Sequence, residues 1–341
     1  MRRMLNTLFI TAPNAYLALE NENLIVRLDD EVKLRVPLLN LEAVVQFGYP
    51  GASPALMGQC AQRKIAMTFL TESGRPLAQL VSPSPGNVHL RRAQYRLADD
   101  AQRAAQVAGM IIAAKLLNSR TVLQRAQRDH GEQTGSLRDA TQHLAQLARQ
   151  APRAGSGESL LGIEGEGARH YFQALPSLIL EDQAFWGFSK RTRRPPLDPF
   201  NALLSLLYTL LAHEMQTALF AVGLDSAAGF LHRDRSGRQG LALDMMEELR
   251  PVFADRMALT LVNRKQLSSK DFRCTESGAV LLQDAARKAV LTAWQQRKQD
   301  MITHPYLQEK IPFGLIPYAQ ALLMARFIRK DLDAYPPFFW R

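Results

Sequence analysis

Three segments in the second half of the chain carry carboxylate and imidazole side chains that could bind a metal ion. Glu164 lies between Gly162 and Gly165, His232 ends a Gly-Phe-Leu-His run, and Asp244 lies one helical turn before Glu247. Carboxylate oxygens with one imidazole suit Mg²⁺ or Mn²⁺ better than a structural zinc site. Such an ion can polarise a phosphodiester and stabilise the oxygens of an in-line displacement.

Each segment also has a purely structural interpretation. Glycines inside a helix cost roughly 1 kcal/mol each relative to alanine, which suggests close packing or ligand approach around Glu164, but acidic residues near a helix start are common. A histidine such as His232 is more often structural than a ligand, and Asp244 with its neighbours could form a solvated acidic face. Carboxylates spaced three or four residues apart repel, so a cation or nearby arginines must offset them. The residues indicate a metal site only when the segments are taken together.

The charge distribution predicts a polyanionic partner. The formal net charge is +10, and residues 190–194, Lys-Arg-Thr-Arg-Arg, hold four basic side chains in five positions. Arginines in such a run can contact phosphates, which favours nucleic acid. The alternative is a basic surface loop. The prolines that follow keep the run extended, and Asp198 or Asn201 can cap the next helix.

Composition excludes several other classes of protein. The 341 residues include two cysteines, Cys60 and Cys274, without Cys-x-x-Cys spacing, which argues against a disulfide scaffold and a zinc-thiolate site. The apolar stretches are too short for a membrane span, so we expect a soluble, cytoplasmic protein. Phosphate-loop, dinucleotide and Gly-x-Ser-x-Gly motifs are absent from the sequence.

Hydrophobic patterning predicts where these segments lie in the fold. Residues 1–82 are β-rich. Alternation of apolar and polar residues over 24–28 and 32–36, around a polar turn, predicts a hairpin, and residues 41–47 and 65–70 are typical of buried strands. Ser-Pro at 53–54 predicts the start of a helix. Prolines and a glycine mark residues 83–86 as a linker. Residues 87–341 show helical patterning, beginning with a helix over 88–118 kinked at Gly109. We therefore expect an α+β chain, with a small N-terminal β-rich domain before a larger all-helical catalytic domain.

The motifs, in this order, resemble the CRISPR-associated integrase family, the endonuclease and integrase of the spacer-acquisition step. The matching pieces are Gly-Ile-Glu-Gly-x-x-Ala-Arg-x-Tyr-Phe at 162–172, Arg-Arg-Pro-Pro-x-Asp-Pro-x-Asn at 193–201, Gly-Leu-Asp-x-x-x-Gly-Phe-Leu-His at 223–232 and Leu-x-x-Asp-x-Met-Glu-Glu-x-Arg-Pro at 241–251. The resemblance covers essentially the whole chain. The amino-acid sequence of residues 39–57 is most similar to the type I-C branch of this family.

The resemblance implies a role for individual residues of this chain. Glu164, His232 and Glu247 are the implied ligands of Mg²⁺ or Mn²⁺ and Asp244 is an auxiliary catalytic carboxylate, with Glu166 as the alternative to Glu164. Many family members carry aspartate at the position of Glu247. We also expect DNA contacts from a set of residues in or beside the motifs, namely Arg169, Arg191, Arg193, Arg194, Asn201 and Arg250.

The resemblance further implies an activity and partners. The 3′-hydroxyl of a captured DNA fragment attacks a phosphodiester at the edge of a CRISPR repeat, so double-stranded DNA is the substrate. The N-terminal domain makes a homodimer, and two dimers flank a dimer of a small CRISPR-associated partner protein in a heterohexameric adaptation complex. The alternatives are a DNA-capturing scaffold without catalysis and a general nuclease of branched DNA in repair. The aromatic C-terminus, residues 335–340, could dock this partner or be buried in its own domain.

Overall fold

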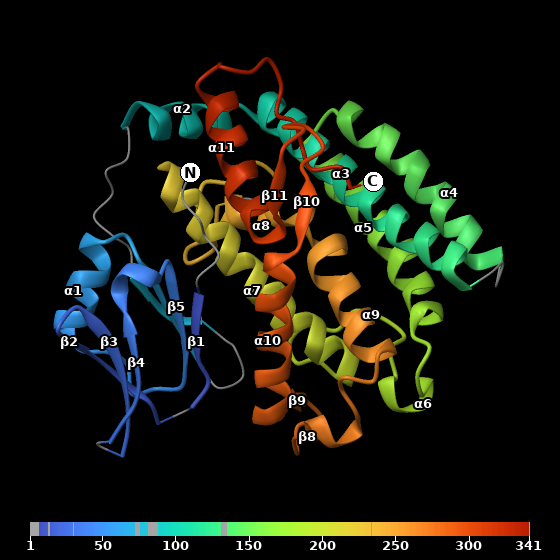
Figure 1. Ribbon diagram of the computed structural model, residues 1–341. Helices are drawn as coiled ribbons and strands as arrows, with labels where there is room; N and C mark the ends of the chain where they lie inside the picture. Colours follow the sequence, from blue (N-terminus) through green and yellow to red (C-terminus); the bar gives the residue numbers. More distant parts are fainter. Residues whose placement is uncertain are drawn as a thin grey trace. The chain divides into compact units, whose positions relative to one another are not determined.

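The computed structural model describes residues 7–12, 14–29, 31–71, 76–80, 88–130, 135–232 and 234–340. The chain forms two compact units (Figure 1). The first consists of residues 1–85, 282–301 and 312–315, and the second of residues 86–281, 302–311 and 316–341. The predicted linker at 83–86 lies outside the described residues.

The first unit contains a mixed sheet built around a buried parallel pair of strands. The strands follow the order β1 (Thr7–Ile10), β5 (Ala43–Phe47), β6 (Ala66–Leu70) and β7 (Pro76–Leu80). β5 lies parallel to β1 and β6, whereas β7 is antiparallel to β6. Parallel neighbours need a crossover, which α1 (Pro54–Gln62) provides between β5 and β6. The Ser53 hydroxyl accepts a hydrogen bond from the Leu56 amide at 3.2 Å, so the predicted helix start and both predicted strands are confirmed.

A second, antiparallel sheet completes the N-terminal segment of this unit. Its strands run in the order β2 (Tyr16–Glu20), β3 (Asn23–Leu28) and β4 (Glu31–Pro37). The β3–β4 pairing confirms the predicted hairpin. Leu17 and Leu24 are fully buried in a core that includes Cys60 and Met67, while β4 is exposed along most of its length.

A helix from near the end of the chain belongs to the first unit. α10 (Asp284–Gln299) buries Trp294, places Arg287 over the ring of Phe47 at 5.5 Å, and lets Gln295 donate a 2.6 Å hydrogen bond to the carbonyl of Thr7. The predicted second domain, residues 87–341, therefore does not correspond to the second unit. These contacts join residues far apart in sequence, and a local hydrophobic period does not say which sheet a helix will cover.

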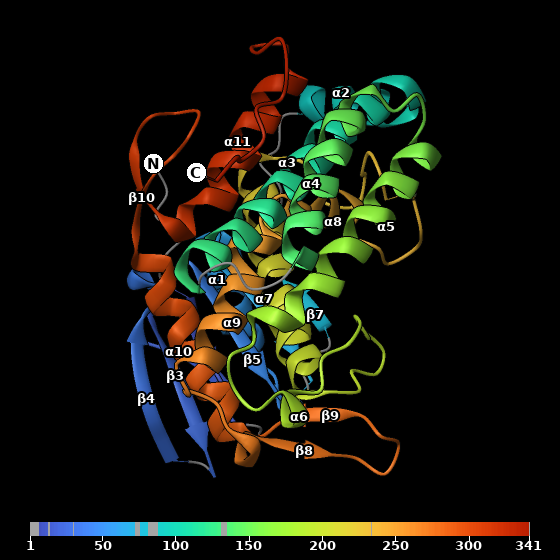
Figure 2. The ribbon, with the colours of Figure 1, turned by 90° about the vertical axis from the view of Figure 1, so that its right-hand side faces the viewer.

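The second unit is dominated by helices. α3 (Ala101–His130) packs against α4 (Gly135–Gln150) and α5 (Gly157–Ala174), and all three are visible in Figure 2. The predicted helix over 88–118 is interrupted at residue 100, between α2 (Val88–Asp99) and α3, where the Asp100 side chain accepts a 3.0 Å hydrogen bond from the Arg103 amide, and α3 continues through Gly109. Gly109 serves close packing instead, because an added Cβ would lie 2.6 Å from the carbonyl oxygen of Ala151.

The longest apolar helix, α7 (Pro199–Val222), is buried on most of its circumference, as expected for the centre of a large helical unit. Asp198 caps its start by accepting a 2.7 Å hydrogen bond from the Asn201 amide, and Gly223 ends it with φ of 86°. No helix in the described part of the chain is long and apolar enough to cross a membrane. The remaining α-helices of the described residues are α6 (Gln183–Trp186), α8 (Gly240–Glu247), α9 (Arg256–Asn263) and α11 (Ile316–Ile328), with a π-helical turn at Pro251–Asp255.

The second half of the chain is not all-helical, which corrects the prediction for it. Two short ribbons interrupt the helices, formed by β8 (Phe272–Cys274) with β9 (Val280–Leu282) and β10 (Met301–Thr303) with β11 (Lys310–Pro312). Strands of three residues are too short for a period-two pattern to stand out from a helical one. The fold class is α+β, as predicted.

Candidate metal centre

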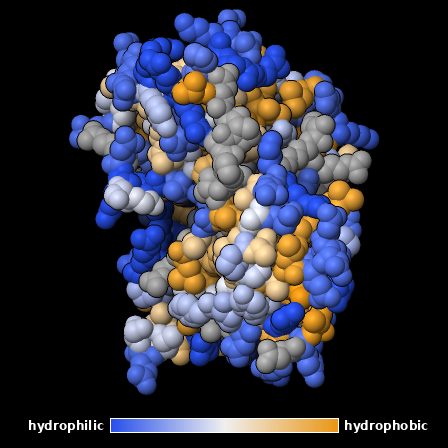
Figure 3. Space-filling model, turned by 90° about the vertical axis from the view of Figure 1, so that its left-hand side faces the viewer, coloured by the Kyte–Doolittle hydropathy of each residue, from blue (hydrophilic) through white to orange (hydrophobic). Residues whose placement is uncertain are grey.

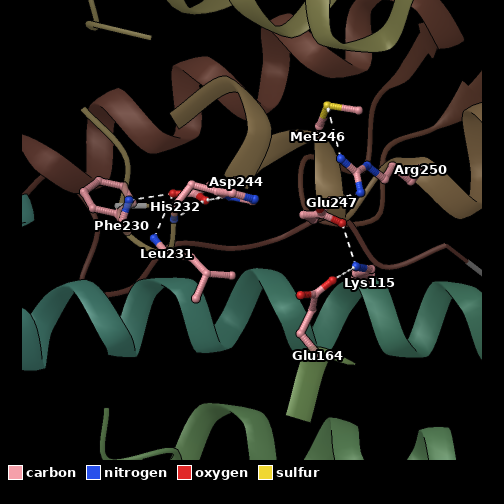
Figure 4. Close-up of polar contacts among 9 residues, drawn as sticks. All are labelled: Lys115, Glu164, Phe230, Leu231, His232, Asp244, Met246, Glu247 and Arg250. Atoms are coloured by element: carbon pink, nitrogen blue, oxygen red, sulfur yellow. Dashed lines mark hydrogen bonds and ion pairs between the residues drawn. The ribbon is translucent and has the colours of Figure 1, made fainter. Parts of the chain in front are cut away.

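Two of the predicted metal ligands meet at one lysine. Lys115 on α3 lies between Glu164 on α5 and Glu247 on α8 (Figure 4). Its ammonium forms an ion pair with Oε1 of Glu164 and lies 2.7 Å from Oε2 of Glu247. The side chains of Lys115, Glu164 and Glu247 are 11%, 23% and 3% exposed, so the ion pairs are largely shielded from water. The structure thus brings two carboxylates from different helices to a single cation.

Glu247 is the most strongly held of these carboxylates. Its Oε1 lies 2.8 Å from Nη1 of Arg250, so both oxygens face a cation. Burial alone would raise the pKa of Glu247, but Arg250, Lys115 and His232 outweigh it and lower the pKa to about 2. The side chain is therefore ionised at neutral pH, as a metal ligand must be.

His232 is oriented by Asp244. Its Nδ1 lies 2.5 Å from Oδ1 of Asp244, which leaves Nε2 as the ring nitrogen for a ligand (Figure 4). The same carboxylate also accepts hydrogen bonds from the backbone amides of Phe230, Leu231 and His232, at 2.5, 2.9 and 3.0 Å. A buried carboxylate therefore fixes both the loop and the ring. Histidines that bind a metal through one ring nitrogen usually donate a hydrogen bond from the other nitrogen to a carboxylate or a similar acceptor.

Two glycines allow this loop to lie against the start of α8. A Cβ on Gly229 would come within 2.7 Å of the carbonyl carbon of Gly240 and 2.8 Å of Oδ2 of Asp244. A Cβ on Gly240 would lie 2.6 Å from the carbonyl oxygen of Ala227. Real Cβ atoms do not approach so closely, so both positions require glycine for the packing that places His232 beside Asp244.

The glycines around Glu164 differ from one another. A Cβ on Gly167 would meet the side chain of Leu116 on α3 at 2.2 Å, so this glycine serves close helix packing. Gly162 and Gly165 face open space. Glu166 lies on the outer side of α5, half-exposed and 3.8 Å from Nε2 of His170, so Glu164 is the acidic residue of this segment that faces Lys115.

The predicted ligands do not all converge on one point. In the described part of the chain, no group of three or more His, Cys, Asp or Glu side chains is gathered closely enough to hold an ion. Glu164 and Glu247 share Lys115, whereas His232 is engaged with Asp244. The chemistry of the donor set nevertheless fits a divalent ion, because two carboxylates already face a cation and Oε2 of Glu247 is buried without a well-directed hydrogen bond.

Arg250, the second cation that pairs with Glu247, is itself held by contacts with Tyr208. The guanidinium groups of Arg250 and Arg191 lie over the ring of Tyr208, at 4.8 and 5.2 Å from its centre. The Tyr208 hydroxyl donates a 2.6 Å hydrogen bond to Asp255, whose pKa burial raises to about 6. Cation–π contacts of this kind hold Arg250 in place against Glu247.

The six candidate DNA contacts fall into two groups. Arg191 and Asn201 are used internally, joined by a 2.7 Å hydrogen bond, and Arg250 is paired with Glu247. Their contacts position the loop and the acidic site and are not directed at solvent. The members of the set whose side chains are exposed are Arg169, Arg193 and Arg194.

Much of the aromatic C-terminus is buried in its own unit, as one of the two predicted alternatives has it, with Tyr335 and Phe338 removed from solvent. Tyr335 donates a 2.7 Å hydrogen bond to Oε1 of Glu248, and the Phe338 amide donates one of 2.9 Å to Oε2. Burial raises the pKa of Glu248 to about 7, although these hydrogen bonds act in the opposite direction. Asn118, one turn after Lys115, donates to the carbonyl groups of Glu248 and Phe338.

Sequence reasoning missed Lys115, Tyr208 and Glu248. A signal for Lys115 was present, because it is a single charge in the apolar run Ile-Ile-Ala-Ala-Lys-Leu-Leu at 111–117, where a solvated lysine is unexpected. Tyr208 gave no signal, since a tyrosine in an apolar helix is most often a core residue.

Comparison with known proteins supports the resemblance found from the motifs. Residues 8–296 match the family described as CRISPR associated protein Cas1. The chain is 48% identical over 343 residues to a CRISPR-associated endonuclease Cas1 of Chlorobaculum tepidum, with all of both chains covered. It is also 48% identical over 347 residues to one of Rhodospirillum rubrum, again over the full length of both.

Solved structures have the same fold. A chain of a Cas6-RT-Cas1–Cas2 complex matches 99% of this chain and 36% of its own length, with a TM-score of 0.83 and 26% identity. A casposase bound to integration product matches 96% of this chain and 92% of its own, with a TM-score of 0.83 at 20% identity. A Cas1 protein from Thermotoga maritima matches 97% and 99%, with a TM-score of 0.82 at 20% identity. The family match and the full-length relatives show that the chain belongs to the Cas1 family of CRISPR-associated proteins.

Proposed function

We propose that this chain is a divalent-metal-dependent DNA endonuclease and integrase that inserts captured DNA fragments into a CRISPR repeat array. The observation that carries the proposal is the meeting of Glu164 and Glu247 at one cation, in the same unit as a histidine whose ring is fixed by Asp244. The full-length relatives are CRISPR-associated endonucleases, which supports the nuclease activity, and a casposase bound to integration product shares the fold.

The proposed reaction is a transesterification. Mg²⁺ or Mn²⁺ bound at Glu164, His232 and Glu247 would polarise the attacked phosphodiester and stabilise its developing charge. Glu247, ionised at neutral pH, and Glu164 supply carboxylate oxygens. Asp244 holds Nδ1 of His232, which leaves Nε2 of the ring for the metal ion. The protein's share of catalysis is positioning and charge stabilisation. The same site attacked by water would act as a nuclease.

DNA contacts are proposed for the exposed basic residues Arg169, Arg193 and Arg194. Phosphate contacts of this kind orient a duplex without reading its sequence. The net charge of +10 favours a polyanion at the surface. We place the catalytic residues in the second, mostly helical unit, because Lys115, Glu164, His232 and Glu247 all belong to it.

The first unit is the proposed homodimerisation domain. It exposes large hydrophobic side chains, among them Leu39 at 85%, Tyr49 at 71%, and Val32 and Leu34 of β4. Figure 3 shows one face of the molecule, on which hydrophobic side chains gather in patches among hydrophilic ones. Exposed apolar patches of this kind commonly mark protein interfaces.

The wider assembly is proposed from the relatives. A structural neighbour is a Cas6-RT-Cas1–Cas2 complex, which supports Cas2 as a partner. The heterohexamer of two dimers around a dimer of a small partner protein is proposed on the resemblance of the sequence motifs alone. Membership of the type I-C branch rests on the resemblance of residues 39–57 and is proposed on that ground.

The test is a strand-transfer assay with purified protein, its small partner, a labelled DNA fragment and a duplex carrying leader and repeat. We expect joining that requires Mg²⁺ or Mn²⁺ and that is abolished in Glu164→Ala, His232→Ala and Glu247→Ala, while DNA binding largely survives. Salt-sensitive binding without metal-dependent joining would instead identify a DNA-capturing scaffold. Preference for a plain branched duplex over the leader–repeat duplex would identify a general repair nuclease.

A further inference from the structure

Lys115 is a cation inside a site that is expected to hold another cation. Its ammonium is ion-paired with Glu164 and lies 2.7 Å from Oε2 of Glu247, and the side chain is 11% exposed. A lysine that is nearly removed from water is stable only with opposite charge beside it. The ammonium therefore fills the space between two carboxylates that come from α5 and α8.

The charged groups that pair directly at Glu247 and Glu164 balance one another without a metal ion. Lys115 and Arg250 supply two positive charges, and Glu164 and Glu247 supply two negative ones. A divalent ion added to this set would be repelled by both cations in surroundings that screen charge poorly. One of the two must move away for the ion to bind well.

The contacts identify which cation can move. The guanidinium of Arg250 is held twice, over the ring of Tyr208 at 4.8 Å and against Oε1 of Glu247 at 2.8 Å. Lys115 is a point charge on a flexible four-carbon stem, and its ammonium is the group that contacts both carboxylates. Displacing it exposes oxygens of Glu164 and Glu247 together, whereas displacing Arg250 would expose one residue.

We propose that Lys115 is an internal counter-ion of the site: it holds Glu164 and Glu247 in place without metal, and it competes with the divalent ion for them. The inference rests on the proposed metal-dependent function and adds a positioning residue outside the predicted ligands. Metal binding is then an exchange of one cation for another. Removing the ammonium destabilises the metal-free protein and strengthens metal binding.

The test measures Mn²⁺ binding to the full chain by electron paramagnetic resonance, with thermal unfolding of the same samples. We expect Lys115→Met to bind Mn²⁺ about tenfold more tightly or better, because a competing charge is gone. Without metal its Tm falls by several degrees, and Mn²⁺ raises that Tm more than it raises the Tm of the wild type. Lys115→Arg, which keeps a cation, stays close to the wild type in affinity.

Matched controls separate competition from general electrostatics. Arg149→Met removes an exposed positive charge from α4, the helix that packs against α5, and Lys298→Met removes a buried lysine from the first unit. Neither change vacates the space between the two carboxylates, so both should leave the Mn²⁺ affinity within about twofold of the wild type.

Unchanged or weaker Mn²⁺ binding by Lys115→Met overturns the inference and leaves the metal site itself standing. Absence of Mn²⁺ binding by the wild type and all variants overturns the proposed metal-dependent function. If Lys115→Met does not fold, a Mn²⁺-bound crystal structure of the wild type decides. The inference holds if Nζ of Lys115 has left both carboxylates, and it fails if Nζ remains between them.

Discussion

Nδ1 of His232 lies 2.5 Å from Oδ1 of Asp244, and the carboxylate that makes this contact also accepts the amide hydrogens of residues 230–232. One buried side chain thereby sets the loop conformation and the direction of the imidazole ring. Asp244 was predicted to be an auxiliary carboxylate. Its oxygens are occupied by N–H groups of the protein, so it acts on the site by positioning His232.

Replacement of Asp244 by asparagine should weaken metal binding through His232. The amide puts an N–H group where an oxygen now accepts hydrogen bonds, so the loop loses a partner and the ring is no longer fixed. Losses of such partners typically lower metal affinity by about 10- to 100-fold, and we expect Asp244→Asn to do the same in a Mn²⁺ titration. Asp225→Asn is the control, because Asp225 caps the same loop at Ala227 without contacting His232. Equal Mn²⁺ affinities for the two variants would contradict the role of Asp244.

Alanine at Gly229 should disturb the same loop for steric reasons. Its Cβ would lie 2.7 Å from the Gly240 carbonyl carbon and 2.8 Å from Oδ2 of Asp244, so backbone must shift. Overpacking of this kind costs roughly 1–3 kcal/mol, which urea unfolding of Gly229→Ala would detect together with reduced strand transfer. Gly162→Ala is the matched control: its Cβ faces open space within α5, and alanine there stabilises by up to about 1 kcal/mol. A Gly229→Ala protein as stable as this control would show that the loop is looser than the structure indicates.

Glu248 makes the stability of the protein depend on pH. Burial raises its pKa from 4.5 in the unfolded chain to about 7, so the folded state binds the proton more tightly. The stabilisation that this proton gives is complete below about pH 4.5 and is lost as pH rises through about 7. The full effect is on the order of 3 kcal/mol.

The measurement compares the free energy of unfolding of the wild type with that of Glu248→Gln across this pH range. Glutamine cannot ionise but still offers an oxygen to Tyr335 and Gln320. We expect the wild type to lose stability relative to Glu248→Gln as the pH rises, and Asp255, present in both proteins, cancels from the difference. A difference that does not change with pH would mean that Glu248 keeps an ordinary pKa.

Salt dependence should separate the exposed arginines from the internal ones. Arg193→Ala and Arg194→Ala each remove one phosphate contact if the proposed DNA surface is right, so each weakens duplex binding uniformly across sequences. Each should also reduce the slope of log K against log salt by about 1. Arg191→Ala should act mainly on stability, because Arg191 is bonded to Asn201 and stacked on Tyr208. If the variant that carries both Arg193→Ala and Arg194→Ala keeps the wild-type slope of log K against log salt, this loop does not contact DNA.

Features set by neighbours in sequence could be predicted from the sequence. The helix start at Ser53 and the β3–β4 hairpin follow from local backbone chemistry, and the structure confirms them. Of the two caps predicted for α7, Asp198 or Asn201, the structure selects Asp198. The family was also predictable, because its ordered motifs are short and contiguous. Glu164 could be chosen over Glu166 by the register of its motif, and it is the one that faces Lys115.

Features set by contacts between distant residues were decided only by the tertiary structure. A hydrophobic period says that a helix has a buried face but not what covers it, so α10 was assigned to the second domain although it packs in the first unit. For the same reason the role of Lys115 could not be predicted, because it depends on two carboxylates that lie about 50 and 130 residues away in the chain. Sequence motifs named the acidic residues of the site, and only the packing of α3 against α5 and α8 showed the cation that they share.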